Sequence, residues 1–207
     1  WRAVVDAHPE FDAFAGLTKP AWPVEPPEWL LRHPHLGSLM SIHRGVQEGP
    51  CNPRLMHGTN MALRATLFQE GIRYNGNIGP DGTPTYAMGS ETELAIRLDE
   101  LGRKCWFAME PAVGHIIRPE QLTHEWTIRR AYRLGRGMAA MDSHGQPKLP
   151  LRVRLKNMAK AALYPLILPL LAENKAAKRR WYQEMDRGFE DGIRTLRGLK
   201  PRWLKPS

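Results

Sequence analysis

The chain of 207 residues has little cysteine and no long hydrophobic run, and each shortage excludes a class of protein. Its two cysteines, Cys51 and Cys105, form neither a disulfide framework nor a zinc-binding spacing, which favours a reducing compartment. Its most apolar stretch, residues 161–172, has 12 residues, whereas a transmembrane helix needs about 20. The sequence also contains no internal repeat and no low-complexity tract. It therefore predicts an ordinary globular protein rather than a disulfide-rich secreted domain or a membrane-spanning one.

The start of the chain does not resemble a secretion signal. Trp1 and Arg2 are followed by Asp6 and Glu10, with no apolar core. Because the chain also begins without methionine, we expect a fragment or a processed form of a longer protein.

Charge is distributed unevenly along the chain, whose formal net charge is +9. Residues 1–117 contain 10 Lys and Arg against 13 Asp and Glu, whereas residues 118–207 contain 20 against 8. This asymmetry favours a basic C-terminal module that faces an anionic partner, such as a membrane surface, nucleic acid or a phosphorylated substrate.

Two carboxylates lie at the start of the best-defined helix pattern, residues 90–101. Leucines recur on one helical face at three positions: Leu94, Leu98 and Leu101. Ser90 and Glu93 have the spacing of a capping box. Glu91 is then left near the positive end of the helix dipole, which favours its ionised form. It is a candidate general base, or a carboxylate that only complements the helix N-terminus.

Periodicity and turn residues predict the other elements. Residues 1–15 have a helical pattern, and residues 16–37, with five prolines, predict an extended loop. Strands are predicted at residues 59–63, 105–109 and 113–117. Further helices are predicted at residues 64–71, 120–141 and 174–197. The glycine-rich residues 71–89 predict a long loop, and loops of this length usually have a function.

Three segments follow one another in a recognisable order: Gly-Thr-Asn-Met-Ala-Leu-Arg at residues 58–64, Gly-Ser-Glu-Thr-Glu-Leu at 89–94, and Pro-Ala-Val-Gly-His at 111–115. Their order and spacing resemble the C-terminal half of a family 2 glycosyltransferase, over about residues 1–140. The resemblance implies an α/β fold, the acceptor-side portion of a GT-A domain at residues 1–142. A basic, amphipathic helical extension would follow at residues 143–207.

The resemblance implies that the enzyme transfers a sugar, with inversion, from a nucleotide-sugar donor to a hydroxyl of a glycan, lipid or other acceptor. Glu91 would be the general base, although the family usually has Glu-Asp where this chain has Ser90-Glu91. The substrate-binding residues that it implies are Gly58, Asn60, Gly89, Ser90 and Arg118. The plainer interpretation is a tight turn at Gly58 and Asn60, and a solvated surface arginine at Arg118.

The resemblance also implies a divalent metal, Mn²⁺ or Mg²⁺, that stabilises the departing nucleoside diphosphate. Most of its ligands would belong to the N-terminal, nucleotide-binding half of the family's domain. Residues 1–57 contain no Asp-x-Asp motif, so we expect that half upstream of Trp1. His115 is a candidate ligand, with a structural role as the alternative. The other histidines, His57 and His124 among them, show no ligand spacing, and we expect them in packing or on the surface.

Two related activities fit less well. Glu91 and Glu93 lie two residues apart on one helix and point in different directions, so they do not flank a bond as the carboxylates of a glycoside hydrolase do. Gln121 and Trp126 only partly match the Gln-x-x-Arg-Trp motif of processive family members, which favours a non-processive enzyme.

The C-terminal region supports a second hypothesis. Residues 151–172 place Arg and Lys before an apolar run, a pattern typical of a segment that lies on anionic lipid. A solvated basic face is the competing interpretation, and nucleic acid is the least favoured partner because no recognition motif accompanies the charge. We therefore expect a cytoplasmic protein, either free or peripheral on the inner face of the membrane. The alternative to an enzyme is a non-catalytic basic module that binds such a surface or nucleic acid.

Overall fold

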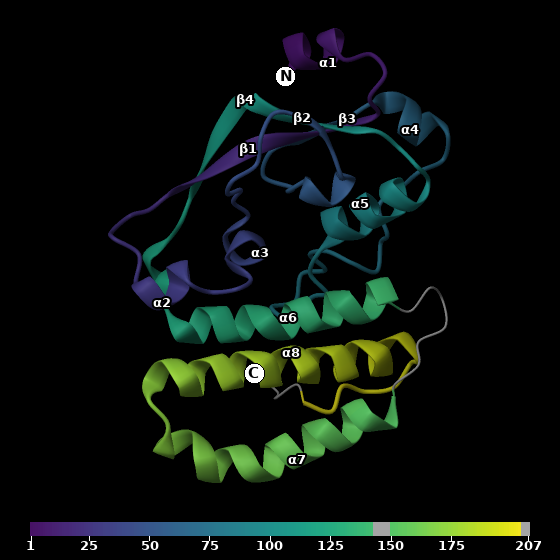
Figure 1. Ribbon diagram of the computed structural model, residues 1–207. Coiled ribbons are helices and arrows are strands. Elements are labelled where there is room, and N and C mark those ends of the chain that lie inside the picture. Colours follow the sequence, from purple (N-terminus) through teal and green to yellow (C-terminus); the bar gives the residue numbers. More distant parts are fainter. Residues whose placement is uncertain (143–149, 204–207) are drawn as a thin grey trace. The chain divides into compact units, whose positions relative to one another are not determined.

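The computed structural model describes residues 1–142 and 150–203, which form two compact units (Figure 1). The first unit consists of Trp1–Asn75 and Ser90–Leu122. The second consists of Gly76–Gly89 and the described residues from Thr123 onward. The first unit is mixed α/β and the second is helical, which confirms the expected α/β class. The domain boundary expected between residues 142 and 143 stays a prediction.

The first unit is built on an open, four-stranded mixed sheet. Its strands are β1 (Ala13–Ala21), β2 (Gly49–Cys51), β3 (Met61–Leu63) and β4 (Cys105–Ile116), in the order β2-β4-β1-β3. The two central strands, β1 and β4, are parallel, whereas the short edge strands pair antiparallel with them. The strand predicted within residues 59–63 is confirmed at β3.

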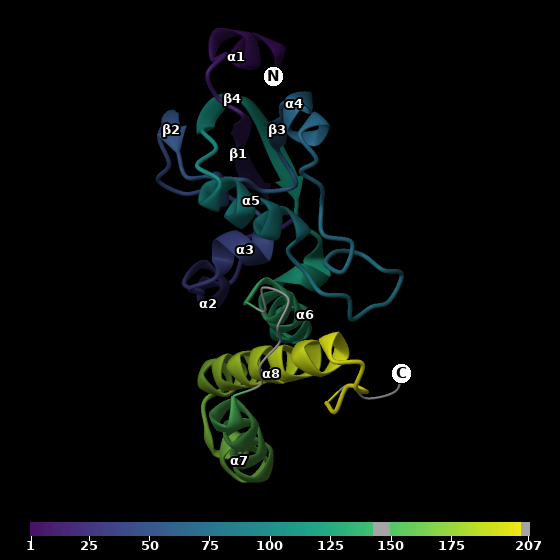
Figure 2. The same cartoon turned by 90° about the vertical axis from the view of Figure 1, so that its right-hand side faces the viewer.

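The two faces of this sheet are covered by different elements (Figure 2). Alternate side chains of β1 and β4 pack on helix α5 (Ser90–Glu100), as the pleat of a strand requires. This core includes Ala13, Ala15, Leu17, Leu94, Ala95, Leu98, Cys105 and Phe107. On the opposite face, beside α1 (Arg2–Ala7), Trp1 meets Phe14 edge-on and His8 stacks on Trp106.

Short helices complete the first unit. They are α2 (Glu28–Leu31), α3 (Leu36–Met40) and α4 (Ala65–Gln69), with 3-10 turns at Pro53–Leu55 and Pro119–Leu122. The helices predicted at residues 64–71 and 90–101 are confirmed by α4 and α5. Helix α5 ends as its sequence indicates, because Gly102 has a φ of 67° and its amide donates to Asp99 O while Arg103 N donates to Leu98 O.

The helix predicted over residues 1–15 is confirmed only at α1, because strand β1 occupies residues 13–21, where the end of that helix and the start of the loop over residues 16–37 are expected. The first six residues of β1 are all buried, so they show no alternation of apolar and polar side chains. A central strand that is covered on both faces has a nearly continuous apolar sequence instead. Pro20 is tolerated because β3 pairs only with residues 13–15, which leaves one edge of β1 without a ladder partner at that point.

Strand β4 also corrects a prediction, because residues 105–116 form one strand instead of two separated at Pro111. The pairing with β1 shifts register there: Gly16 lies opposite Ala108, but Thr18 lies opposite Val113. Pro111 falls inside this irregularity, where the ladder is already interrupted, so its missing N–H breaks no bond of a regular ladder.

The second unit contains helices α6 (His124–Asp142), α7 (Leu151–Ile167) and α8 (Glu173–Leu196). The helices predicted at residues 120–141 and 174–197 are therefore confirmed. Glycines allow α6 and α8 to approach closely, since a β-carbon on Gly135 would overlap Met185 O and one on Gly188 would overlap Tyr132 O. No helix in the described part of the chain combines the length and the apolar character needed to cross a bilayer.

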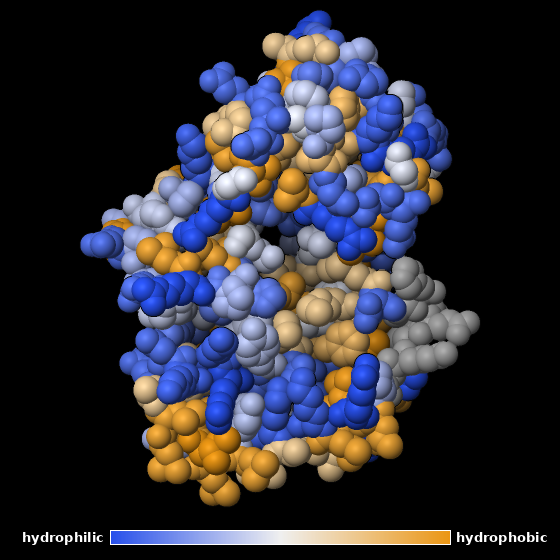
Figure 3. All heavy atoms as spheres, viewed as in Figure 1, coloured by the Kyte–Doolittle hydropathy of each residue, from blue (hydrophilic) through white to orange (hydrophobic). Residues whose placement is uncertain are grey.

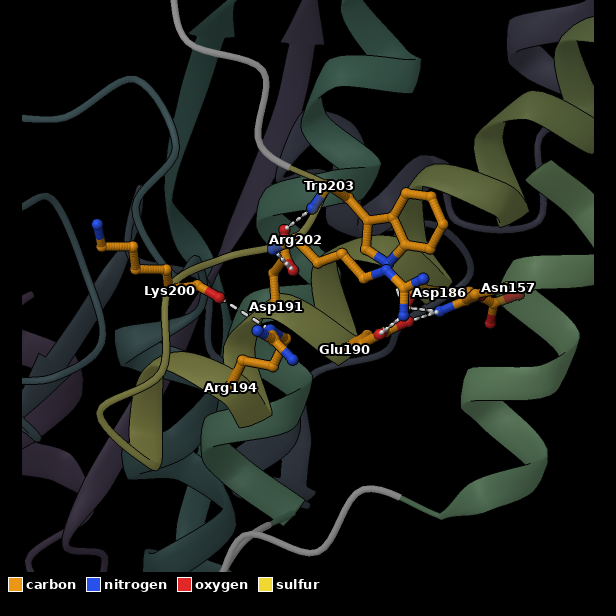
Figure 4. A network of polar contacts seen from close by, with 8 residues as sticks. All are labelled: Asn157, Asp186, Glu190, Asp191, Arg194, Lys200, Arg202 and Trp203. Atoms are coloured by element: carbon orange, nitrogen blue, oxygen red, sulfur yellow. Dashed lines mark hydrogen bonds and ion pairs between the residues drawn. The ribbon is translucent and has the colours of Figure 1, made fainter.

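Two adjacent acids of α8, Glu190 and Asp191, are fully buried and hold the residues that follow the helix (Figure 4). Asp191 accepts hydrogen bonds from Tyr132 Oη at 2.8 Å and from the backbone amides of Arg202 and Trp203. Glu190 Oε2 accepts from Trp203 Nε1 at 2.9 Å. Buried carboxylates are retained only where such donors meet them.

Candidate functional site

The first two segments singled out from the sequence meet in the first unit. Gly58 lies in the turn between the Pro53–Leu55 3-10 turn and β3, and Glu91 lies in the first turn of α5. A β-carbon added to Gly58 would stand 3.4 Å from Cδ and 3.5 Å from Oε1 of Glu91. The bare backbone of Gly58 therefore lies against the Glu91 carboxylate, which is only partly buried.

Glu91 and its helix neighbours do not form the capping box that the sequence predicts. Ser90 Oγ donates to Glu91 Oε2 at 3.2 Å, whereas the Glu93 carboxylate accepts two bonds from the Arg97 guanidinium, at 2.7 and 2.9 Å. Glu93 is thus held one turn along by an (i, i+4) ion pair. Because the Glu93 carboxylate is paired with Arg97, Glu91 is the first-turn carboxylate that faces Gly58.

His57 interacts with two other histidines and with this carboxylate. His43 and His57 stack with ring centroids 4.2 Å apart and an interplanar angle of 14°. The charges of Glu91 and His115 both act on the pKa of His57, which places all four groups in one electrostatic cluster. The sequence predicts only a packing or surface position for His43 and His57, because the residues that separate them from Glu91 along the chain give no periodic signal.

Hydrogen bonds fix the orientation of two of these rings. His43 Nδ1 accepts from the Thr18 amide at 3.2 Å, so its Nε2 carries the proton that is donated to Leu55 O at 2.7 Å. His115 Nδ1 lies against Met40 O, a carbonyl that can only accept, and it must therefore be the protonated nitrogen. His115 Nε2 is left as the nitrogen that a proton or a ligand could reach.

The surroundings of His57 shift its pKa strongly. Burial, and then electrostatic interaction with the neighbouring His43, lower the pKa of His57 to about 4. A hydrogen bond to the backbone of Ser41 and the negative charge of Glu91 act in the opposite direction but do not prevail. His57 is therefore neutral at pH 7, and its Nδ1 is buried without a hydrogen-bond partner among the described residues.

Tyr74 is a further neighbour that the sequence analysis missed. Burial, and then the charge of Glu91, raise the pKa of its phenol, which remains partly exposed. Tyr74 lies in the loop after α4, where isolated aromatic residues among glycines give no periodic pattern. A phenol kept protonated beside a carboxylate can donate a hydrogen bond to a bound hydroxyl or to the carboxylate itself.

Asn60 has a structural role in this geometry. Its Nδ2 donates to Leu17 O at 3.0 Å and to Pro111 O at 2.9 Å, which bridges β1 and β4 where their ladder is interrupted. Its Oδ1 accepts from Trp1 Nε1 at 3.1 Å. Because its side chain is buried in these bonds, Asn60 positions the turn that carries Gly58, and its predicted contact with substrate stays a prediction.

Gly89 and Arg118 are not joined to the cluster by any contact that the described residues show. Gly89 has a φ of 109°, a conformation that favours glycine, immediately before Ser90. The exposed Arg118 guanidinium pairs with Glu120 at 2.9 Å, which fits the plainer interpretation of a surface arginine. Their roles in substrate binding stay predictions.

A metal site is not assembled by the residues that the structure describes. Within residues 1–142 and 150–203, no group of three or more His, Cys, Asp or Glu side chains could hold a metal ion. His115 has one ring nitrogen held by a carbonyl, an arrangement that metal-binding histidines also use, but it lacks companion ligands in this part of the chain. The Mn²⁺ or Mg²⁺ expected from the resemblance stays a prediction.

Comparison of the chain with family models, curated proteins and solved structures found no match. The family suggested by residues 58–64, 89–94 and 111–115 therefore stays a prediction from those residues.

Proposed function

We propose that this chain forms the acceptor side of an inverting glycosyltransferase of the GT-A fold, similar to family 2 enzymes, in which Glu91 is the general base. The donor is a nucleotide sugar, and the acceptor is a hydroxyl group of a glycan, a lipid or another molecule.

In the proposed reaction, the acceptor oxygen attacks the anomeric carbon while the bond from that carbon to the nucleoside diphosphate breaks. Glu91 takes the proton of the hydroxyl group, so positive charge does not build up on the attacking oxygen. The leaving diphosphate keeps the electron pair of the broken bond. Attack from the opposite side inverts the configuration of the sugar, and no step assigned to these residues requires a metal.

The observation that carries this proposal is the contact between Gly58 and Glu91. Two segments more than 30 residues apart in the sequence meet at one carboxylate, and His115 of the third segment contributes to the same electrostatic cluster. A base must reach its substrate, and the absence of a side chain at residue 58 keeps one side of the carboxylate uncovered.

The proposal is tested by replacing Glu91 with its uncharged isostere. In the full-length protein, Glu91→Gln should lower kcat for sugar transfer about 10²- to 10⁴-fold, the usual contribution of a general base. Glu91→Asp should keep part of the activity, because the carboxylate is retained on a shorter arm. Transfer and donor hydrolysis are measured with a panel of nucleotide sugars.

The matched control is Glu100→Gln, the same change at an exposed position at the other end of α5. It should leave kcat unchanged, and circular dichroism checks that both variants fold. Sugar transfer by Glu91→Gln at the wild-type rate would show that Glu91 is not the base.

A further inference from the structure

Helix α7 exposes its apolar side chains and buries a polar one. Asn157 is almost fully buried, and its Nδ2 donates to Glu190 Oε2 at 2.8 Å and to Asp186 O at 3.1 Å. Lys160, on the same side of the helix, pairs with Asp186. Helix α7 is therefore attached to α8 partly by polar groups, which lie on the same side as partly buried residues such as Val153, Tyr164 and Ile167.

The outward side of α7 carries an apolar stripe. Its members follow one another at intervals of three or four residues: Leu151, Leu155, Met158, Ala162 and Leu166. Leu155 is 55% exposed and Leu166 70%, and Leu170 in the following 3-10 turn reaches 83%. Figure 3 shows the hydrophobic colour gathered over this edge of the second unit. Soluble proteins rarely leave a contiguous apolar surface of this kind without a partner.

The charged residues of the segment that carries the apolar stripe are all basic. Residues 150–172 contain no Asp or Glu, and exposed Arg152 and Arg154 flank the stripe near its start. The first turns of α8 add one exposed acid, Glu173, and four more exposed basic side chains: Lys175, Lys178, Arg179 and Arg180. Long basic side chains can extend toward phosphate groups while their methylenes lie along apolar surface.

We propose that the apolar stripe of α7 docks on an anionic lipid surface, with the helix axis in the plane of the membrane. The leucines would enter the boundary between headgroups and acyl chains, and Arg152 and Arg154 would meet lipid phosphates beside them. A second copy of the chain fits this surface less well, because a twofold contact would bring two all-positive segments together. This proposal does not depend on sugar transfer.

The test is vesicle flotation of the full 207-residue chain. It should float with vesicles that contain about one-third phosphatidylglycerol in phosphatidylcholine, and markedly less with phosphatidylcholine alone. The double variant Leu155→Glu, Leu166→Glu should weaken binding at least tenfold, because it places charges within the stripe. Arg152→Glu with Arg154→Glu should weaken binding to the anionic vesicles alone.

The matched control is Leu101→Glu, the same change at a leucine of the first unit that is 60% exposed. It should float like the wild type, and circular dichroism checks the fold of every variant. Failure of the wild-type chain to float with anionic vesicles, or equal flotation of the double variant, would overturn the proposal. Sedimentation velocity identifies the competing case, in which wild-type chains self-associate through the stripe and bind no lipid.

Discussion

The α-carbon of Gly58 faces the Glu91 carboxylate so closely that a β-carbon there would lie 3.4 Å from Glu91 Cδ. An alanine would be in ordinary contact at that distance, whereas a β-branched side chain would have to displace the carboxylate. Gly58 has no left-handed backbone conformation that would require glycine. Its small size therefore matters through its contact with Glu91.

We expect Gly58→Val to lower kcat for sugar transfer by about tenfold, because a shift of about 1 Å in a catalytic group is enough for such losses. Gly58→Ala should have a smaller effect. Gly76→Val is the control, since a β-carbon at Gly76 has open space around it. Wild-type kcat in a folded Gly58→Val protein would mean that the position of the carboxylate is not critical.

The buried neutral His57 predicts a pH dependence of stability. Its pKa is about 4 in the folded protein and near 6.5 in the unfolded chain, so between these values the unfolded chain binds more protons. The free energy of unfolding should therefore fall as the pH is lowered from about 6.5 toward 4, with a contribution from His57 of at most about 1.4 kcal/mol per pH unit.

Urea unfolding at pH 7 and pH 5 measures this slope, and His57→Gln should flatten it. The same change at His124, on the exposed side of α6, should leave the slope as it is. An NMR titration in which His57 takes up its proton near pH 6.5 would contradict the expected effect of burial.

The structural features that the sequence predicts correctly are those that depend on local patterns of residues. The helix over residues 90–101 and its glycine stop follow from leucine spacing and from the left-handed conformation at Gly102. The α/β class follows from the mixture of such helices with short apolar segments. These features are set within a dozen neighbouring residues, so one stretch of sequence is enough to read them.

What the sequence could not predict depends on long-range contacts. The continuity of β4 through Pro111 requires Asn60, which bridges the interrupted ladder from another part of the chain. The stacking of His43 on His57, whose pKa the charge of Glu91 affects, likewise results from tertiary packing. Neither arrangement leaves a periodic trace, because the residues involved are separated by loops of irregular length.

Gly188 allows α6 and α8 to approach each other closely. A β-carbon at this position would overlap the backbone carbonyl of Tyr132, so Gly188→Ala must separate the two helices. We expect a net loss of about 1–2 kcal/mol, since overpacking costs more than the helix propensity gained from alanine. Thermal unfolding measures the loss, and Gly76→Ala, in open space, should change stability by less than about 0.5 kcal/mol.

Replacement of Asp191 should have a large effect on the stability of the second unit. This fully buried carboxylate accepts from Tyr132 Oη and from the amides of Arg202 and Trp203, at 2.6 to 2.9 Å. Asp191→Asn keeps the shape but replaces one accepting oxygen with an NH₂ group that faces another donor. We expect a loss of about 2–4 kcal/mol in the free energy of unfolding, because hydrogen bonds to a charged group are worth about 1.5–3 kcal/mol each.

Tyr132→Phe removes only one of those donors and should cost less, about 1–2 kcal/mol, while the amides stay paired. The two changes act on one hydrogen bond, so the double variant should lose less than the sum of the single losses. Asp6→Asn is the matched control, because Asp6 is exposed in a surface pair with Arg2 and should contribute little. Urea unfolding compares all four variants, and equal stability of Asp191→Asn and Asp6→Asn would mean that the buried carboxylate does not hold residues 202 and 203 in place.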